Sequence, residues 1–104
     1  MVSQYEQYFV QECLLFNKII DEYKNIKLEN INGIDKLRKQ ALDLASNFVT
    51  IKSNKNIIAD KIGTSKVQFG DWCHDKYRIL MEVHTDLSVD LTHARNDMRQ
   101  YGTV

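Results

Sequence analysis

The sequence predicts an all-α fold, an antiparallel bundle of three helices whose last helix is overlong and coiled-coil-like. The 104 residues contain no proline and only four glycines, whereas proline averages about 5% of residues in proteins. Two long segments repeat their apolar residues at alternating spacings of three and four, which is the spacing of helices that pack along one edge. The hydrophobic fraction of 43% is that of a folded chain and not of a disordered one.

The first predicted helix covers residues 3–27. Ser3 and Glu6 have the spacing of a capping box at its start. The segment 28–33 ends it, because Asn32-Gly33 readily adopts positive φ. The stripe along this helix is wide and aromatic, so it must be covered on more than one side. Its members are Tyr5, Phe9, Cys13, Phe16, Ile20 and Tyr23.

The second predicted helix covers residues 34–52 and carries an apolar heptad. The residues of this heptad are Ile34, Leu37, Ala41, Leu44, Phe48 and Ile51. Beyond it, residues 52–56 are either a loop or a helix of poor local propensity, so the helix ends at 52 or extends to 62. Gly63 then ends the helical pattern, and Thr64 or Ser65 caps the next helix.

The third predicted helix covers residues 65–101 and is about 55 Å long at 1.5 Å per residue. Its apolar seam keeps four heptads in register. The seam consists of Cys73, Tyr77, Leu80, His84, Leu87, Leu91, Ala94, Met98 and Tyr101. Before His84 the helix is apolar on several sides, as in a bundle, and after it only the seam positions remain apolar, as in a coiled coil. The C-terminal half is therefore expected to meet one helix, from this chain or from another.

The seam predicts a non-catalytic interaction or assembly subunit whose partner is a protein. Trp72 and Tyr77 are expected to anchor the seam to the bundle, and His84 to set its register as a polar seam residue. Homo-oligomer and hetero-complex both remain open, because the seam residues are of mixed type. The expected partner-binding residues are Trp72, Tyr77, Leu80, His84, Leu87, Leu91, Ala94, Met98 and Tyr101.

Composition and motifs give no sign of a cofactor, a metal site or a nucleic-acid partner. The formal net charge is zero, so no global basic field attracts nucleic acid. The lysines between 52 and 66 have no aromatic residue among them on which a base could stack. His74, His84 and His93 point to different sides of the predicted helix, which argues against a shared metal ion.

Arg78 and His84 carry a second hypothesis. Their Arg-x5-His spacing resembles the motif of HEPN-type ribonucleases, which are small helical-bundle proteins that use such a pair across a dimer. The resemblance implies a ribonuclease in which Arg78 and His84 are catalytic. The match covers seven residues, and Ile79 stands where that family commonly has an asparagine.

The remaining expectations concern location and domain organisation. Residues 1–104 are expected to form one helical domain. The sequence has no signal-peptide pattern and no apolar run of membrane-spanning length. Cys13 and Cys73 both lie on apolar stripes, which is typical of buried thiols in a reducing compartment. We therefore expect a cytoplasmic or nuclear protein without a membrane partner.

Overall fold

The computed structural model describes the backbone of residues 4–102, and the side chains of residues 4 and 6–96. Within this described backbone there are four helices: α1 (Gln4–Asn25), α2 (Ile31–Ser53), α3 (Lys55–Ile62) and α4 (Lys66–Gly102). The described residues contain no strand, and the predicted all-α class is confirmed. Ser3, the expected cap of the first helix, lies outside the described residues.

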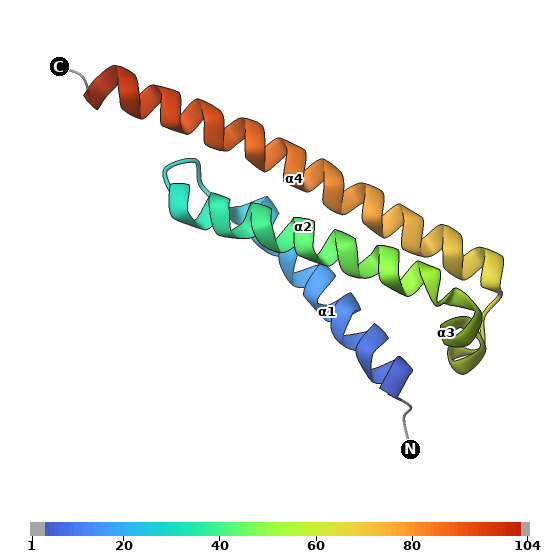
Figure 1. The fold of residues 1–104 in the computed structure, drawn as a ribbon. Coiled ribbons are helices and arrows are strands. Elements are labelled where there is room, and N and C mark those ends of the chain that lie inside the picture. The colour runs from blue at the N-terminus through green and yellow to red at the C-terminus, as the bar shows by residue number, and fades with distance from the viewer. Residues whose placement is uncertain (1–3, 103–104) are drawn as a thin grey trace.

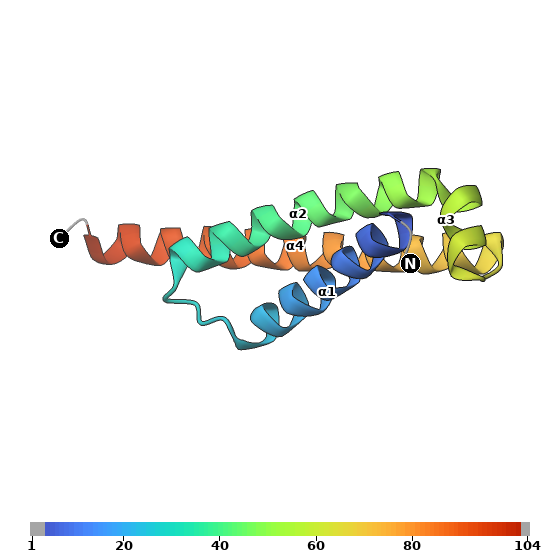
Figure 2. The same ribbon diagram turned by 90° about the horizontal axis from the view of Figure 1, so that it is seen from below.

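The helices α2 and α4 run antiparallel, side by side, and form the long axis of the molecule (Figure 1). The short helix α3 forms the turn between them, and α1 crosses the pair obliquely on one face (Figure 2). The result is an elongated molecule of 61 × 24 × 17 Å. The hairpin of α2 and α4 is therefore the main unit of the fold, and α1 and α3 pack against it.

The core lies along the contact between α2 and α4. The whole apolar heptad of α2 is buried, and so are the α4 residues on the facing side. Side chains of α1 close the core from one face, with Phe16 and Ile19 buried. The buried hydrophobic residues in the described part of α4 are Phe69, Cys73, Leu80, Val83, Leu87 and Leu91.

The turn between α1 and α2 differs from its expected form. The second helix begins at Ile31, so Asn32-Gly33 belongs to its first turn and is not a break with positive φ. Asn30 is the cap, since its side-chain oxygen accepts a hydrogen bond of 3.0 Å from the backbone N–H of Gly33. A Cβ at Gly33 would collide with the Asn30 amide. Glycine is needed there because it lets the cap approach the helix.

The structure of residues 52–62 also differs from both alternatives that the sequence left open. The second helix ends at Ser53, and a separate helix α3 follows after the single residue Asn54. The backbone N–H of Asn54 still donates to the carbonyls of Thr50 and Ile51, and its side-chain amide donates to Thr50 at 2.9 Å. Asn54 therefore ends one helix and starts the next with hardly any loop between them.

Gly63 ends α3 in the left-handed region, with φ of 75°. Only glycine adopts this conformation without strain. The backbone N–H groups of Gly63 and Thr64 both donate to the carbonyl of Ala59. This sharp end returns the chain toward α2 and starts α4 beside it.

Candidate interaction surfaces of α4

The first half of the α4 seam is occupied within the chain. Leu80 and Leu87 are 0% exposed and Leu91 is 4% exposed. All three belong to the core cluster that also contains the apolar row of α2. In this structure the helix that meets them is α2 of the same chain, which was one of the two alternatives left open by the sequence.

The second half of α4 extends beyond α2. His84 lies opposite Arg38, so the antiparallel register places Leu91 opposite Ile31, the first residue of α2. Residues 92–102 therefore continue past the N-terminal end of α2, as Figures 1 and 2 show. We call residues 92–102 the α4 extension. Ala94 in this extension is half-buried, and the side chains of Met98 and Tyr101 lie outside the described residues.

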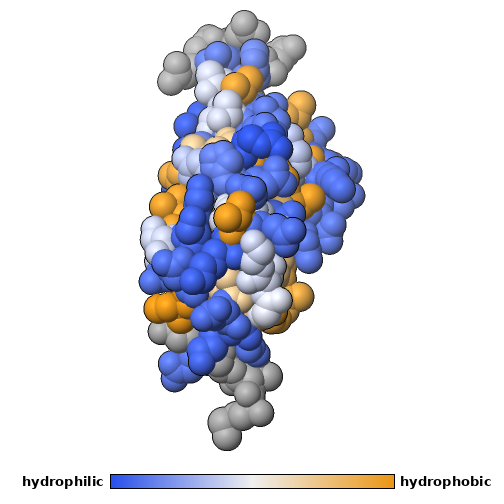
Figure 3. All heavy atoms as spheres, turned by 90° about the vertical axis from the view of Figure 1, so that its right-hand side faces the viewer, coloured by the Kyte–Doolittle hydropathy of each residue, from blue (hydrophilic) through white to orange (hydrophobic). Residues whose placement is uncertain are grey.

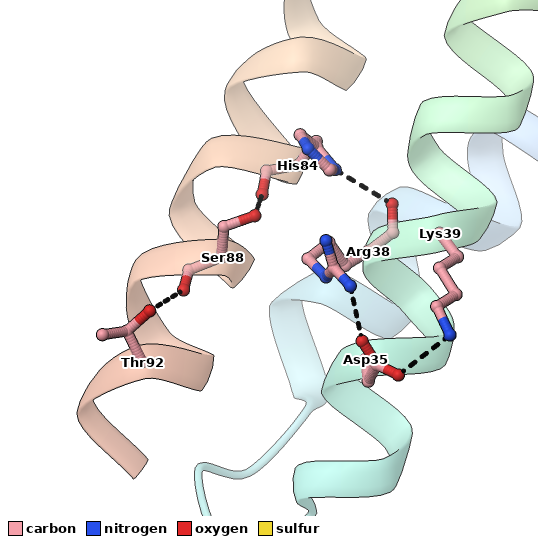
Figure 4. Close-up of polar contacts among 6 residues, drawn as sticks. All are labelled: Asp35, Arg38, Lys39, His84, Ser88 and Thr92. Atoms are coloured by element: carbon pink, nitrogen blue, oxygen red, sulfur yellow. Dashed lines mark hydrogen bonds and ion pairs between the residues drawn. The ribbon is translucent and has the colours of Figure 1, made fainter. Parts of the chain in front are cut away.

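His84 makes a polar contact in the seam (Figure 4). Its ring Nδ1 lies 3.2 Å from the backbone oxygen of Arg38 in α2. A carbonyl oxygen can only accept, so this contact requires a proton on Nδ1. Beside it, the Ser88 hydroxyl donates to the His84 carbonyl at 2.7 Å, and the Thr92 hydroxyl donates to the Ser88 carbonyl at 3.0 Å. The contact with the Arg38 carbonyl gives His84 a role in the pairing of α4 with α2.

A small ion-pair group lies at the same point on α2. Arg38 contacts Asp35 at 2.6 Å, and Lys39 contacts the other oxygen of Asp35 at 3.2 Å (Figure 4). Hydrogen bonds from Arg38 and then Lys39 hold the pKa of Asp35 below its ordinary value. The Arg38 side chain is thereby directed along α2, while the backbone oxygen of the same residue faces the His84 ring.

Trp72 joins α1 to the hairpin. Its ring lies 5.2 Å from that of Phe9 in α1 and 5.7 Å from that of Phe48 in α2, measured between centroids. The ammonium of Lys76 lies 4.9 Å above the Phe16 ring and 5.3 Å from the Trp72 ring. The expected anchoring role of Trp72 corresponds to a contact inside this chain.

Tyr77 and Met81 line a groove on the side of the hairpin that α1 leaves open. The groove has a volume of about 270 Å³, and Leu42 and Val49 of α2 form its other wall. Both α2 residues are large apolar side chains that remain exposed. Because Leu42 and Val49 lie outside the heptad row of α2, the sequence pattern does not indicate them, and only the position of α1 shows that their side is uncovered.

Arg78 and His84, the pair of the ribonuclease hypothesis, do not come together within the chain. Arg78 is exposed and is paired with Asp75 at 2.9 Å and Glu82 at 2.8 Å. Its hydrogen bond to Asp75 is the main reason why the pKa of Arg78 is raised further. The two residues line different surface grooves, as a separation of six positions on a helix requires.

The described part of the chain shows neither a metal-binding cluster nor a membrane-spanning helix. Among the residues that the structure describes, no three His, Cys, Asp or Glu side chains are grouped so that they could hold a metal ion. None of the helices, over the same residues, is long and apolar enough to cross a membrane. Cys13 is half-buried and Cys73 is buried, and both thiols are free.

Seen from the end formed by α3, the surface is a mixture of hydrophilic side chains and scattered apolar ones (Figure 3). No protein-family model matches this chain, and the searches of curated proteins and of solved structures give no match either. The geometry of this chain is therefore the guide to its function.

Proposed function

We propose that this chain is a non-catalytic interaction subunit that pairs with a helix of a protein partner through the α4 extension. The observation that carries the proposal is the length of α4, which continues past the end of α2 while its heptad continues through Ala94, Met98 and Tyr101. A helix with an apolar seam gains stability when a second helix covers that seam. Within this chain, α2 begins too late to provide that cover.

The proposed pairing is a short coiled coil that prolongs the contact between α2 and α4. The partner helix takes the position that α2 would occupy if it were longer. Either a second copy of this chain or a different protein can provide such a helix. We place this function in the cytoplasm or nucleus, which the two free thiols support.

A matched pair of charge substitutions tests this proposal. Met98→Asp puts a carboxylate into the seam, where it must be desolvated on pairing, while Asn96→Asp adds the same charge at an exposed position nearby. Sedimentation equilibrium of the full chain, from micromolar to millimolar concentration, is the measurement. Self-association that Met98→Asp weakens at least about tenfold and Asn96→Asp leaves unchanged supports pairing of two copies.

A monomer mass over the whole range excludes a second copy as the partner. Hydrogen exchange then gives the decisive second measurement, because an unpaired extension exchanges quickly. Amides of 92–102 that are as well protected as those of α2 in such a monomer would overturn the proposal.

A further inference from the structure

We propose that the turn between α1 and α2 opens into continuous helix, so that α1 leaves its own hairpin and docks into the same groove of a second copy of this chain. The groove is the one between α2 and α4 that α1 fills in the closed molecule. This proposal does not depend on the α4 extension, and the two are tested by different observables.

The apolar rows of α1 and α2 are in register with each other across the turn. The α2 row begins at Ile34, and counting backward across the turn in steps of four and three leads through Asn30 and Lys27 to Tyr23. From Tyr23 the same count continues along the inner face of α1. It meets Ile20, Phe16, Cys13 and Phe9 in turn. A continuous helix over both segments would keep one apolar edge, interrupted only at Lys27 and Asn30.

The connection between α1 and α2 has a composition that is compatible with a helix. Residues 26–30 contain neither glycine nor proline, and Lys27, Leu28 and Glu29 are all good or acceptable helix formers. Leu28 is 60% exposed, so the closed turn buries little of it. Local hydrogen bonds hold the turn: Asn30 N–H donates to the Lys27 carbonyl at 3.0 Å, and the Asn30 side chain caps α2. The closed and open forms therefore differ mainly in these local bonds.

The helix α1 holds the hairpin through side-chain contacts that a second copy can reproduce. In a two-fold dimer each α1 would make the same contacts with its partner that it makes in the closed molecule, so exchange of this kind keeps the contacts between α1 and the hairpin. These contacts are Phe9 with Phe69 and Trp72, Phe16 with Phe48, Glu12 with Asn47, and Tyr23 with Asp86.

Two polar contacts identify the occupant of the groove as α1 itself. Glu12 is only 9% exposed and accepts a hydrogen bond of 3.1 Å from the Asn47 amide. The Tyr23 hydroxyl donates to Asp86 at 2.7 Å. An unrelated amphipathic helix would leave Asn47 and Asp86 without these partners, whereas α1 of a second copy supplies both.

Variants of the turn test the opening. Asn30→Ala removes the cap of the closed turn, and Asn32→Ala is the control, because it changes an exposed asparagine in the same helical turn and keeps the cap. A cap is worth about fivefold in equilibrium, and each dimer loses two. We expect Asn30→Ala to raise the dimerisation constant roughly 25-fold over that of Asn32→Ala after refolding at millimolar concentration. Equal constants for these two variants contradict the proposal.

Glu29→Pro acts in the opposite direction. A proline within the fused helix disfavours it by roughly a hundredfold or more, so this variant is expected to lose the dimer that forms by exchange of α1 under the same conditions. If it does not fold, Leu28→Gly combined with Glu29→Gly provides the same test with a smaller effect. A dimer that persists at full strength in the folded variant overturns the proposal.

Isotope-filtered nuclear Overhauser spectra of the wild-type dimer separate exchange of α1 from surface pairing. The dimer is refolded from equal amounts of labelled and unlabelled chains. The rings of Phe9 and Trp72 are 5.2 Å apart, so an exchanged α1 gives cross-peaks between them from one chain to the other. A dimer without these inter-chain cross-peaks, or no dimer of the wild type and of Asn30→Ala at millimolar concentration, refutes the proposal. A dimer that lacks the cross-peaks and is weakened by Met98→Asp would support the pairing of α4 extensions instead.

Discussion

At the scale of single residues, Cys73 has the most strongly altered acid–base chemistry in the described part of the chain. It is fully buried on the face of α4 that meets α2, and this burial raises its pKa to about 11. The nearby Cys13 thiol adds to the shift. A thiol that is hard to ionise is also a poor nucleophile, so Cys73 is expected to react with disulfide reagents only after Cys13 has done so.

The raised pKa of Cys73 makes stability depend on pH. The unfolded thiol ionises near its ordinary value of 9.0, whereas the folded one ionises near 11. Between these values unfolding releases a proton, so the contribution is complete below pH 9 and is lost as the pH rises. We expect the free energy of unfolding to fall by about 1 kcal/mol between pH 8 and pH 10 for this reason.

Urea titrations at pH 8 and pH 10 measure this change. In Cys73→Ala the corresponding part of the fall is absent, although the variant is less stable at both values. Cys13→Ala is the comparison variant and should keep most of the fall, because burial is the larger cause of the raised pKa of Cys73 and the Cys13 thiol is a smaller one. An equal fall in the wild type and in Cys73→Ala would show that other groups control the alkaline stability.

His84 shows how far residue-level prediction reaches. The heptad placed it in the seam, and the structure agrees that it faces α2. Its hydrogen-bond acceptor could not be predicted, because the Arg38 carbonyl belongs to a helix whose register against α4 is fixed only by tertiary packing. Periodicity identifies a buried face and leaves open what covers that face.

At the scale of helices, the two heptads predicted most of the buried residues of α2 and α4, although Ala45 and Val83 are buried outside them. The sequence left open whether α4 would meet this chain or another one. The separate helix α3 was missed for a different reason. It is separated from α2 at Asn54, and neither glycine nor proline is involved. The backbone and side-chain amides of Asn54 form hydrogen bonds with the carbonyls of Thr50 and Ile51. Such a break has no distinct signal in the sequence.

The α4 extension is expected to contribute little to folding. No residue of α2 lies opposite 92–102, so removal of residues 97–104 should change the free energy of unfolding by no more than about 0.5 kcal/mol. The same truncation should abolish association through α4. Thermal unfolding at low protein concentration tests the first expectation, and a loss above roughly 2 kcal/mol would mean that the extension packs back onto the bundle.

At the scale of the whole molecule, the absence of catalysis is the simplest expectation to test. Arg78 is held by Asp75 and Glu82, and His84 contacts the Arg38 carbonyl, so neither side chain is arranged toward a common substrate. Purified protein is expected to leave single-stranded and hairpin RNA intact over hours. Cleavage that disappears in both Arg78→Ala and His84→Ala, but not in Lys39→Ala, would support the ribonuclease hypothesis instead.

The elongated form of the molecule also sets distances between anything bound to it. A compact protein of this size has a radius of gyration of about 13 Å, whereas this chain has 17.1 Å and a long axis of 61 Å. The α3 end and the tip of α4 lie at opposite ends of that axis (Figure 1). Two molecules attached at these ends would be separated by about twice the roughly 30 Å diameter of a small domain. The chain would thus act as a spacer, holding its neighbours apart at a distance fixed by the length of α4.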